Sequence, residues 1–90
     1  MTRTEITEEI LTIFRREFEM ENPGLDEDLR EGGEFDSVDA IELLLEIERY
    51  LKSELTHEEK QSAMEIRTIR QIVDYVWRMA EKRGLAEATA

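Results

Sequence analysis

The hydrophobic and polar positions of the chain follow a helical period in its first segment, from about residue 4 to residue 20. Apolar side chains recur there every three or four residues and share one face: Ile6, Ile10, Ile13, Phe14 and Phe18. Such a stripe predicts an amphipathic helix. Thr2 followed by Glu5 predicts a capping box at its start, and the Asn-Pro-Gly sequence at residues 22–24 predicts its end.

Residues 22–35 lack this period and predict a long loop. The loop is rich in acids, which are Asp26, Glu27, Asp28, Glu31 and Glu34, and it contains the pair Gly32-Gly33. A loop of this length in a small domain is usually functional or held in place by its own apolar side chains. We expect Leu29 and Phe35 to pin it against the helices.

Three further helices are predicted after the loop. One runs from about residue 37 to residue 53, with Asp36 as its N-cap, and a short one covers about residues 57–65. The last begins near Thr68, which forms a capping box with Gln71, and ends at Gly84. Its apolar face consists of Ile69, Ile72, Val73, Val76 and Ala80, with Trp77 closing one end of the core.

The pattern predicts an all-α fold, because no stretch alternates as a strand does. We expect a small four-helix bundle with a long loop between the first two long helices and a short third helix. The helical domain covers residues 1–83, and residues 84–90 are expected to form a flexible C-terminal tail.

The predicted second helix has three distinct faces at 100° per residue. Its core face consists of Ala40, Leu43, Leu44, Ile47 and Leu51. The opposite face consists of Asp39, Glu42, Glu46 and Arg49. Between the two lies an apolar arc of Val38, Ile41 and Leu45, which we expect either to be partly exposed or to line the mouth of a cavity. Acids beside exposed apolar side chains suit a protein-docking surface, although acids also simply solvate the outer face of many helices.

Charge and composition narrow the range of partners. The 90 residues carry a formal net charge of -11, which repels nucleic acid and anionic membranes and attracts basic protein surfaces. The chain has no cysteine, no signal-peptide pattern and no apolar run of transmembrane length. We therefore expect a cytoplasmic monomer that binds cationic proteins and neither binds nucleic acid nor inserts into a membrane.

A serine stands at the start of the second helix, in the sequence Asp36-Ser37-Val38-Asp39. A serine in this place is most often an N-cap. The other two serines, Ser53 and Ser62, fall within predicted helices, whereas Ser37 follows the long loop, where an enzyme could reach it. A phosphodiester on Ser37 would lie by free backbone amides and the positive end of the helix dipole.

Residues 35–43, Phe-Asp-Ser-Val-Asp-Ala-Ile-Glu-Leu, resemble the phosphopantetheine attachment region of acyl carrier proteins. That family typically has Asp-Ser-(Leu or Val)-Asp followed by a helix with acid and Leu at these offsets. The Asp28-Leu29 pair and the stretch Thr-Ile-Arg-Gln-Ile-Val-Asp-Tyr-Val at residues 68–76 agree with the family in order and approximate spacing. The resemblance spans most of the chain, from about residue 6 to residue 83.

The resemblance implies a role for each matched residue. Ser37 would receive 4'-phosphopantetheine from coenzyme A, added by a phosphopantetheinyl transferase, and Asp36 would help recognition and lie near the magnesium ion of that enzyme. Acyl groups would be carried as thioesters on the thiol of the arm, and the bundle core would shelter part of them. The partner-docking face would consist of Val38, Asp39, Ile41, Glu42, Leu45, Glu46 and Glu48.

The implied function is to present acyl intermediates to fatty-acid, lipid or polyketide-type biosynthetic enzymes. The partners would be acyltransferases, ketosynthases or ligases with basic docking patches. Arg49 and Tyr50 interrupt the acidic run that is usual in fatty-acid carriers, and residues 54–66 form a longer stretch than usual. These departures favour a specialised carrier, and the short chain leads us to expect a free-standing one.

Two alternatives remain open at this stage: a carrier of an amino-acyl group, and an unmodified acidic helical interaction module. An enzyme is not expected, because the sequence offers no nucleophile–base pair. A single histidine, His57, cannot build a histidine-rich metal site, so we expect no metal centre and a surface or capping role for it. We expect the basic residues near the C-terminus to complement the helix end and to form internal ion pairs with the acidic helices; they are Arg67, Arg70, Arg78, Lys82 and Arg83.

Overall fold

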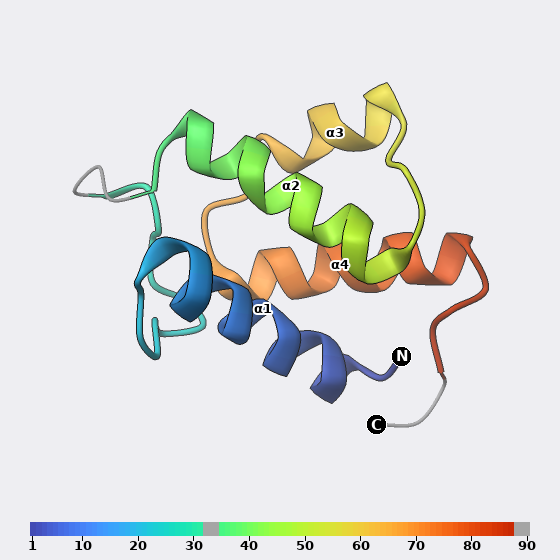
Figure 1. Cartoon of the computed structure of the whole chain (residues 1–90), viewed down its shortest axis with the longest axis horizontal. Helices are drawn as coiled ribbons and strands as arrows, with labels where there is room; N and C mark the ends of the chain where they lie inside the picture. The colour runs from blue at the N-terminus through green and yellow to red at the C-terminus, as the bar shows by residue number, and fades with distance from the viewer. Residues whose placement is uncertain (32–34, 88–90) are drawn as a thin grey trace.

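The computed structural model of the chain describes residues 1–31 and 35–87, so the predicted Gly32-Gly33 pair and Glu34 lie outside the described residues. It contains four helices, α1 (Arg3–Phe18), α2 (Ser37–Leu51), α3 (His57–Ala63) and α4 (Ile69–Lys82) (Figure 1). No strand occurs in the part of the chain that the structure describes. The predicted all-α bundle, with its long first connection and short third helix, is confirmed.

Every helix begins with a capping box, in which the N-cap side chain and the side chain three residues later each accept a backbone N–H of the other residue. The four pairs are Thr2–Glu5, Asp36–Asp39, Thr56–Glu59 and Thr68–Gln71. The boxes predicted at Thr2 and Thr68 and the N-cap predicted at Asp36 are confirmed. The box at Thr56 was not predicted, although the sequence pattern that marks it is present.

The first three helices each end two residues before the end predicted from the sequence. The cause is local for α1 and α2, whose C-caps Glu19 and Lys52 both have a left-handed backbone with φ of 55°. A residue in this conformation cannot continue a right-handed helix, so it turns the chain away.

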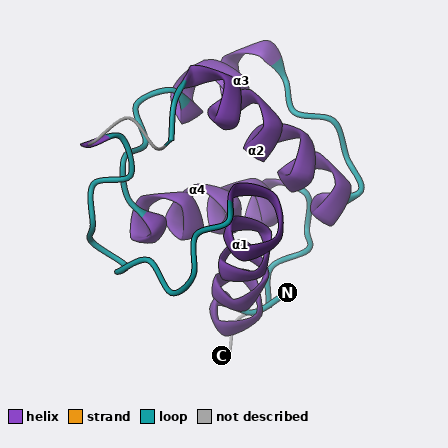
Figure 2. Cartoon of the chain, turned by 60° about the vertical axis from the view of Figure 1, so that its left-hand side comes forward, coloured by secondary structure: helices purple, strands orange, loops and turns teal. Residues whose placement is uncertain are grey.

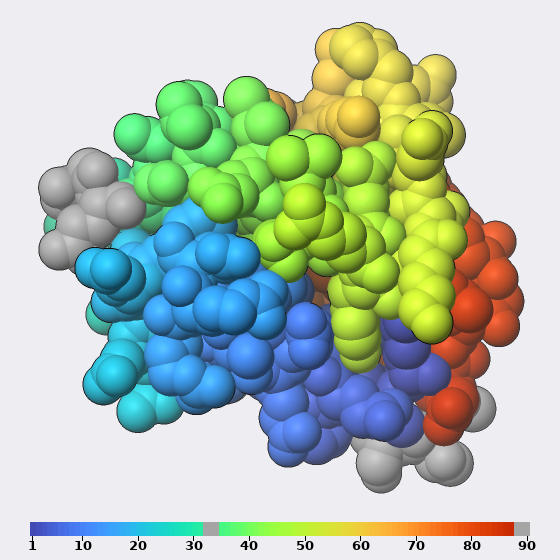
Figure 3. Space-filling model, viewed as in Figure 1, coloured from blue at the N-terminus to red at the C-terminus, as the bar shows by residue number. Residues whose placement is uncertain are grey.

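The helices surround one core, with α1 and α3 on opposite sides and α2 and α4 between them (Figures 1 and 2). α1 packs mainly against α4 and also touches α2. In the space-filling view, α1 and α2 lie side by side on the face toward the reader (Figure 3). None of the helices described is long and apolar enough to cross a membrane.

The predicted inner faces of α2 and α4 are confirmed, because all of their residues named above are buried. Tyr75 and Met79 of α4 are buried as well, which the sequence interpretation missed. Trp77 is half-buried against the core, and the guanidinium of Arg3 lies 5.7 Å from the centre of its ring. This distance is within the range of a cation–π contact.

The loop between α1 and α2 is held in place by both of the side chains predicted to do so, since Leu29 and Phe35 are buried. Backbone hydrogen bonds also tie it to the start of α4, from Leu29 N to Arg67 O (2.7 Å) and from Arg70 N to Leu25 O (2.9 Å). The ion pairs Arg67–Asp28 and Arg70–Asp26 reinforce this attachment. These two arginines form internal ion pairs, as predicted, but their partners are acids of the loop and not of the helices.

The N-terminus of the chain is hydrogen-bonded to the segment that follows α4. The amino group of Met1 donates to Leu85 O (2.8 Å), and Glu87 N donates to Met1 O (2.7 Å). Gly84, which was predicted to end the last helix, follows α4 with a positive φ of 70°. Residues 88–90 lie outside the described residues, and the flexibility expected for residues 84–90 stays a prediction.

Candidate functional site

Ser37 is the first residue of α2 and is exposed to solvent. Its neighbour Asp36 performs the capping, because Asp36 Oδ1 accepts both Val38 N and Asp39 N at 3.0 Å. Asp39 Oδ2 accepts Asp36 N in return, at 3.1 Å. The N-cap role that serines often have at a helix start thus belongs to Asp36, and the hydroxyl of Ser37 is left available for chemistry.

This cap corrects one expectation about the helix start. Free amides at the helix start were expected to favour an anion, but two of them, at Val38 and Asp39, are bonded to Asp36 Oδ1. An anion on Ser37 would therefore gain from the helix dipole, an effect of about 0.3–1 kcal/mol at an exposed site, rather than from these two donors.

Ser37 is exposed, but the backbone just before it is held in place by a buried aromatic cluster. Phe35, two residues earlier, is buried, and the centre of its ring lies 5.3 Å from that of Phe14 and 5.4 Å from that of Phe18. Both partners belong to α1. α1 and the end of the loop thus hold the backbone that presents the serine.

A strip of exposed apolar side chains begins beside Ser37. Val38, Ile41 and Leu45 are 70%, 54% and 48% exposed, which confirms their predicted exposure on α2. Glu42 is also exposed, one turn after Val38. Large apolar side chains in a contiguous, acid-flanked strip are typical of a protein-docking surface.

Glu46 does not share this exposure, and the prediction that it faces solvent is wrong. Its side chain is only 9% exposed, with Arg16 Nη2 of α1 3.0 Å from Oε2 and Arg49 Nη1 2.7 Å from Oε1. The helical period of α2 alone put Glu46 on the outer face, but α1 packs beside that face and covers it. The docking role suggested for Glu46 stays untested, although its carboxylate already has two protein partners.

Glu48, another acid of the predicted docking face, also has an internal partner. Its Oε2 accepts Leu55 N at 2.7 Å and lies 4.0 Å from Lys60 Nζ. The carboxylate therefore ties the connection between α2 and α3 to α2. Among the predicted docking acids of α2, Glu42 is the one exposed to solvent without a described internal partner.

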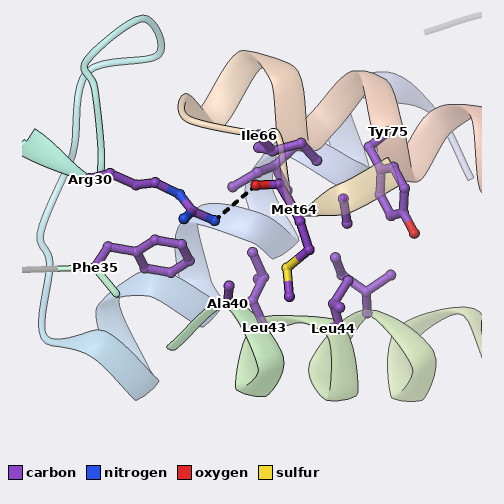
Figure 4. A pocket seen from close by; sticks show the side chains of 11 residues that line it. Arg30, Phe35, Ala40, Leu43, Leu44, Met64, Ile66 and Tyr75 are labelled. Carbon is purple, nitrogen blue, oxygen red and sulfur yellow. Dashed lines mark hydrogen bonds between the residues drawn. The ribbon is translucent and has the colours of Figure 1, made fainter. Parts of the chain in front are cut away.

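A small apolar cavity lies between α2, α3 and α4 (Figure 4). Its free volume of about 10 Å³ is close to that of one water molecule. Ala40, Leu43 and Leu44 of α2 form one wall, and Met64 and Ile66, which follow α3, form another. The cavity begins about one turn after Ser37, so a group attached there could reach it only if the helices moved apart.

Two polar side chains line this cavity. Tyr75 donates its hydroxyl to Glu59 O at 2.7 Å, and burial raises the pKa of Tyr75 to about 12. Arg30, from the loop, donates from Nη2 to Met64 O at 3.2 Å. The sequence interpretation missed Arg30, because no local pattern distinguishes it from a solvated loop arginine.

A family described as "Phosphopantetheine attachment site" matches residues 8–76, which include α2 and α3 entirely and most of α1 and α4. The chain belongs to this family. Members of this family attach 4'-phosphopantetheine covalently, and the chain is accordingly a phosphopantetheine-carrying carrier protein of the acyl carrier type. No curated protein and no solved structure matches the chain significantly.

The site fits such a carrier in the chemistry of its residues. An exposed hydroxyl stands at a helix start that a neighbouring carboxylate already caps, beside an apolar strip and an apolar interior. Within residues 1–31 and 35–87 no three His, Asp or Glu side chains gather as metal ligands. Carriers of this kind are typically non-catalytic and work with a phosphopantetheinyl transferase and with biosynthetic enzymes.

Proposed function

We propose that Ser37 is the attachment residue and that this carrier presents acyl intermediates as thioesters to biosynthetic enzymes. The observation that carries the proposal is the exposed serine at the start of α2, inside the family match, with Asp36 and not Ser37 as the cap. Ser53 and Ser62 suit the role less. Ser53 Oγ accepts Arg83 Nε, and Ser62 Oγ donates to the backbone of its own helix.

In the attachment step Ser37 Oγ attacks the phosphorus of coenzyme A that carries pantetheine. An Oγ–P bond forms while the P–O bond to the second phosphate breaks, and adenosine 3',5'-bisphosphate leaves. The proton of the hydroxyl passes to a base of the transferase. Asp36 uses only Oδ1 for its cap, and we propose that Oδ2 faces the magnesium ion of the transferase.

The bound arm supplies a thiol that holds acyl groups as thioesters. The chain itself holds Ser37 at the surface through Phe35 and provides an apolar interior of Leu43, Leu44 and Ile47 next to it. This lining favours an acyl cargo over an amino-acyl cargo, because burying a charged amine without a partner is costly. Fatty-acid, lipid and polyketide-type pathways all use cargo of this kind.

We further propose that partners dock on the exposed strip of Val38, Ile41 and Leu45, with Glu42 steering their basic patches. Acyltransferases, ketosynthases and ligases with such patches are the expected class. With a net charge of -11, the surface resists self-association and contact with nucleic acid, which supports a monomer; that it acts in the cytoplasm is a further part of the proposal.

Intact-mass measurement tests the attachment. The full chain is incubated with coenzyme A, magnesium and a broad-specificity phosphopantetheinyl transferase. Wild type and a Ser62→Ala control should each gain one phosphopantetheine, and Ser37→Ala should gain none. If none of several transferases modifies the folded wild type, the unmodified interaction module becomes the better explanation.

A further inference from the structure

Arg30 extends from the loop between α1 and α2 to one end of the cavity (Figure 4). Its Nη2 donates to Met64 O at 3.2 Å, just beyond α3. Its Nε is buried and finds no hydrogen-bond partner among the residues that the structure describes. It is the one buried side-chain nitrogen or oxygen without a partner in the described ranges.

A buried donor with no partner among the described residues points to a ligand with an acceptor. A guanidinium stays charged at every physiological pH and carries five N–H donors. Arg30 therefore cannot remove the buried Nε–H donor by losing a proton. Among the described side chains that line this end of the cavity, Phe35, Leu43 and Ile66 offer no acceptor atom, and the thioether of Met64 is only a weak acceptor. An oxygen atom brought into the cavity would be the missing partner.

The path from Ser37 leads to this end of the cavity. Ala40, one turn after Ser37, lines the cavity, and Figure 4 shows Arg30 and Phe35 together at the same end as Ala40. A cargo entering from the start of α2 therefore meets Arg30 before the deeper apolar walls near Tyr75. Because the cavity holds only about 10 Å³, the cargo must also displace the side chains around Arg30 and Met64.

Resting on the proposed function, we propose that Arg30 determines cargo specificity. The interior retains acyl groups that carry a keto or hydroxyl oxygen close to the thioester in preference to saturated acyl groups of equal length. The oxygen accepts a hydrogen bond from Arg30 Nε, while the rest of the chain packs against Leu43 and Leu44. A saturated chain of the same length leaves the Nε donor without a partner and gains only the apolar contacts.

Matched cargoes test this assignment. The transferase loads the full chain from hexanoyl coenzyme A or from its β-keto counterpart, and mass spectrometry confirms one group per chain. In the wild type the midpoint of thermal unfolding should be higher with the β-keto group by about 4–8 °C, the shift expected when one buried donor in a domain of this size is satisfied. The difference should vanish in Arg30→Met and persist in the control Arg67→Met, whose arginine pairs with Asp28 outside the cavity.

A second measurement needs no variant. The Arg30 Nε–H resonance of the wild type should move on loading with the β-keto group and stay in place with the hexanoyl group. Equal midpoints and an unmoved resonance with both groups attached would overturn the role of Arg30 and leave the carrier function standing. Failure to attach either group would overturn the proposed function and the cargo preference together.

Discussion

Arg83, the C-cap residue of α4, donates hydrogen bonds to both carboxylate oxygens of Glu59 in α3. Its Nη1 lies 3.2 Å from Oε2 and its Nη2 lies 2.8 Å from Oε1. The same guanidinium donates to Ser53 Oγ (2.8 Å) and Glu54 O (2.9 Å). One side chain thus joins α3, α4 and the connection after α2. The hydrogen bonds that the Glu59 carboxylate accepts, first those from Arg83 and then the one from Thr56 N, lower the pKa of Glu59 to about 2.

Replacing Glu59 should make the free energy of unfolding less dependent on pH in the acidic range. The folded pKa of Glu59 lies below its ordinary value of 4.5, so its contribution is complete above that value and is lost as the pH falls toward about 2. At neutral pH we expect Glu59→Gln to lower the free energy of unfolding by about 1.5–3 kcal/mol, the range for a hydrogen bond to a charged group. Chemical denaturation at a series of pH values measures both quantities.

The gap between wild type and Glu59→Gln should narrow steadily from about pH 5 to about pH 2, as expected for a group with a lowered folded pKa. Glu58→Gln is the matched control, because Glu58 is the exposed neighbour in the same turn of α3. A constant difference in unfolding free energy over this range would show that the contribution of Glu59 to stability does not depend on its charge.

Glu46→Gln should weaken the attachment of α1 to α2. The carboxylate is bound by Arg16 and Arg49 and is mostly buried, so its loss should cost about 1–3 kcal/mol of unfolding free energy. Glu42→Gln, one turn earlier and exposed, should change stability by less than about 0.5 kcal/mol. Equal losses for the two variants in urea denaturation would contradict the distinction drawn between these acids.

Glu42→Lys should slow modification by the transferase while leaving the fold intact. An exposed acid steers a basic partner through long-range attraction, so the effect should be greatest at low salt and shrink as salt rises. Glu81→Lys, an exposed site on α4, makes the same change in net charge and serves as the control. If both variants slow the reaction equally, overall charge rather than the α2 surface accounts for the effect.

Phe35→Leu should loosen the start of α2. The smaller side chain gives up part of the contact with Phe14 and Phe18, a change that should cost about 1 kcal/mol. Hydrogen exchange at the Val38 and Asp39 amides, which bond to Asp36, should then become faster relative to amides in α4. Unchanged exchange in the variant would mean that the cap alone holds the serine in place.

Local patterns were sufficient to predict most of the fold. The helical period of apolar residues located the three long helices, and it identified core positions such as Leu43 and Ile72, which are buried; the short α3 was predicted from a weaker pattern. Helix starts were predictable because a capping box involves residues only three apart. The same short range explains why the Asp36 cap and the position of Ser37 at the first turn of α2 could be inferred from the sequence.

Features that depend on a second element could not be predicted in this way. Glu46 is buried because α1 brings Arg16 beside it, and the apolar pattern of α2 alone does not indicate where α1 packs. Arg30 lines the cavity only because the loop folds back toward Met64. Tyr75 is covered by α3, whose carbonyl at Glu59 accepts its hydroxyl. Each depends on contacts between residues distant in sequence.

The contact between Met1 and Glu87 marks a suitable place for attaching the molecule to a surface or a label. These residues lie at the corner of the bundle opposite the start of α2, as Figure 1 shows. A surface tether, dye or fused domain joined at this corner would point away from Ser37. Such a linkage would orient many copies alike, with every serine directed toward the solution.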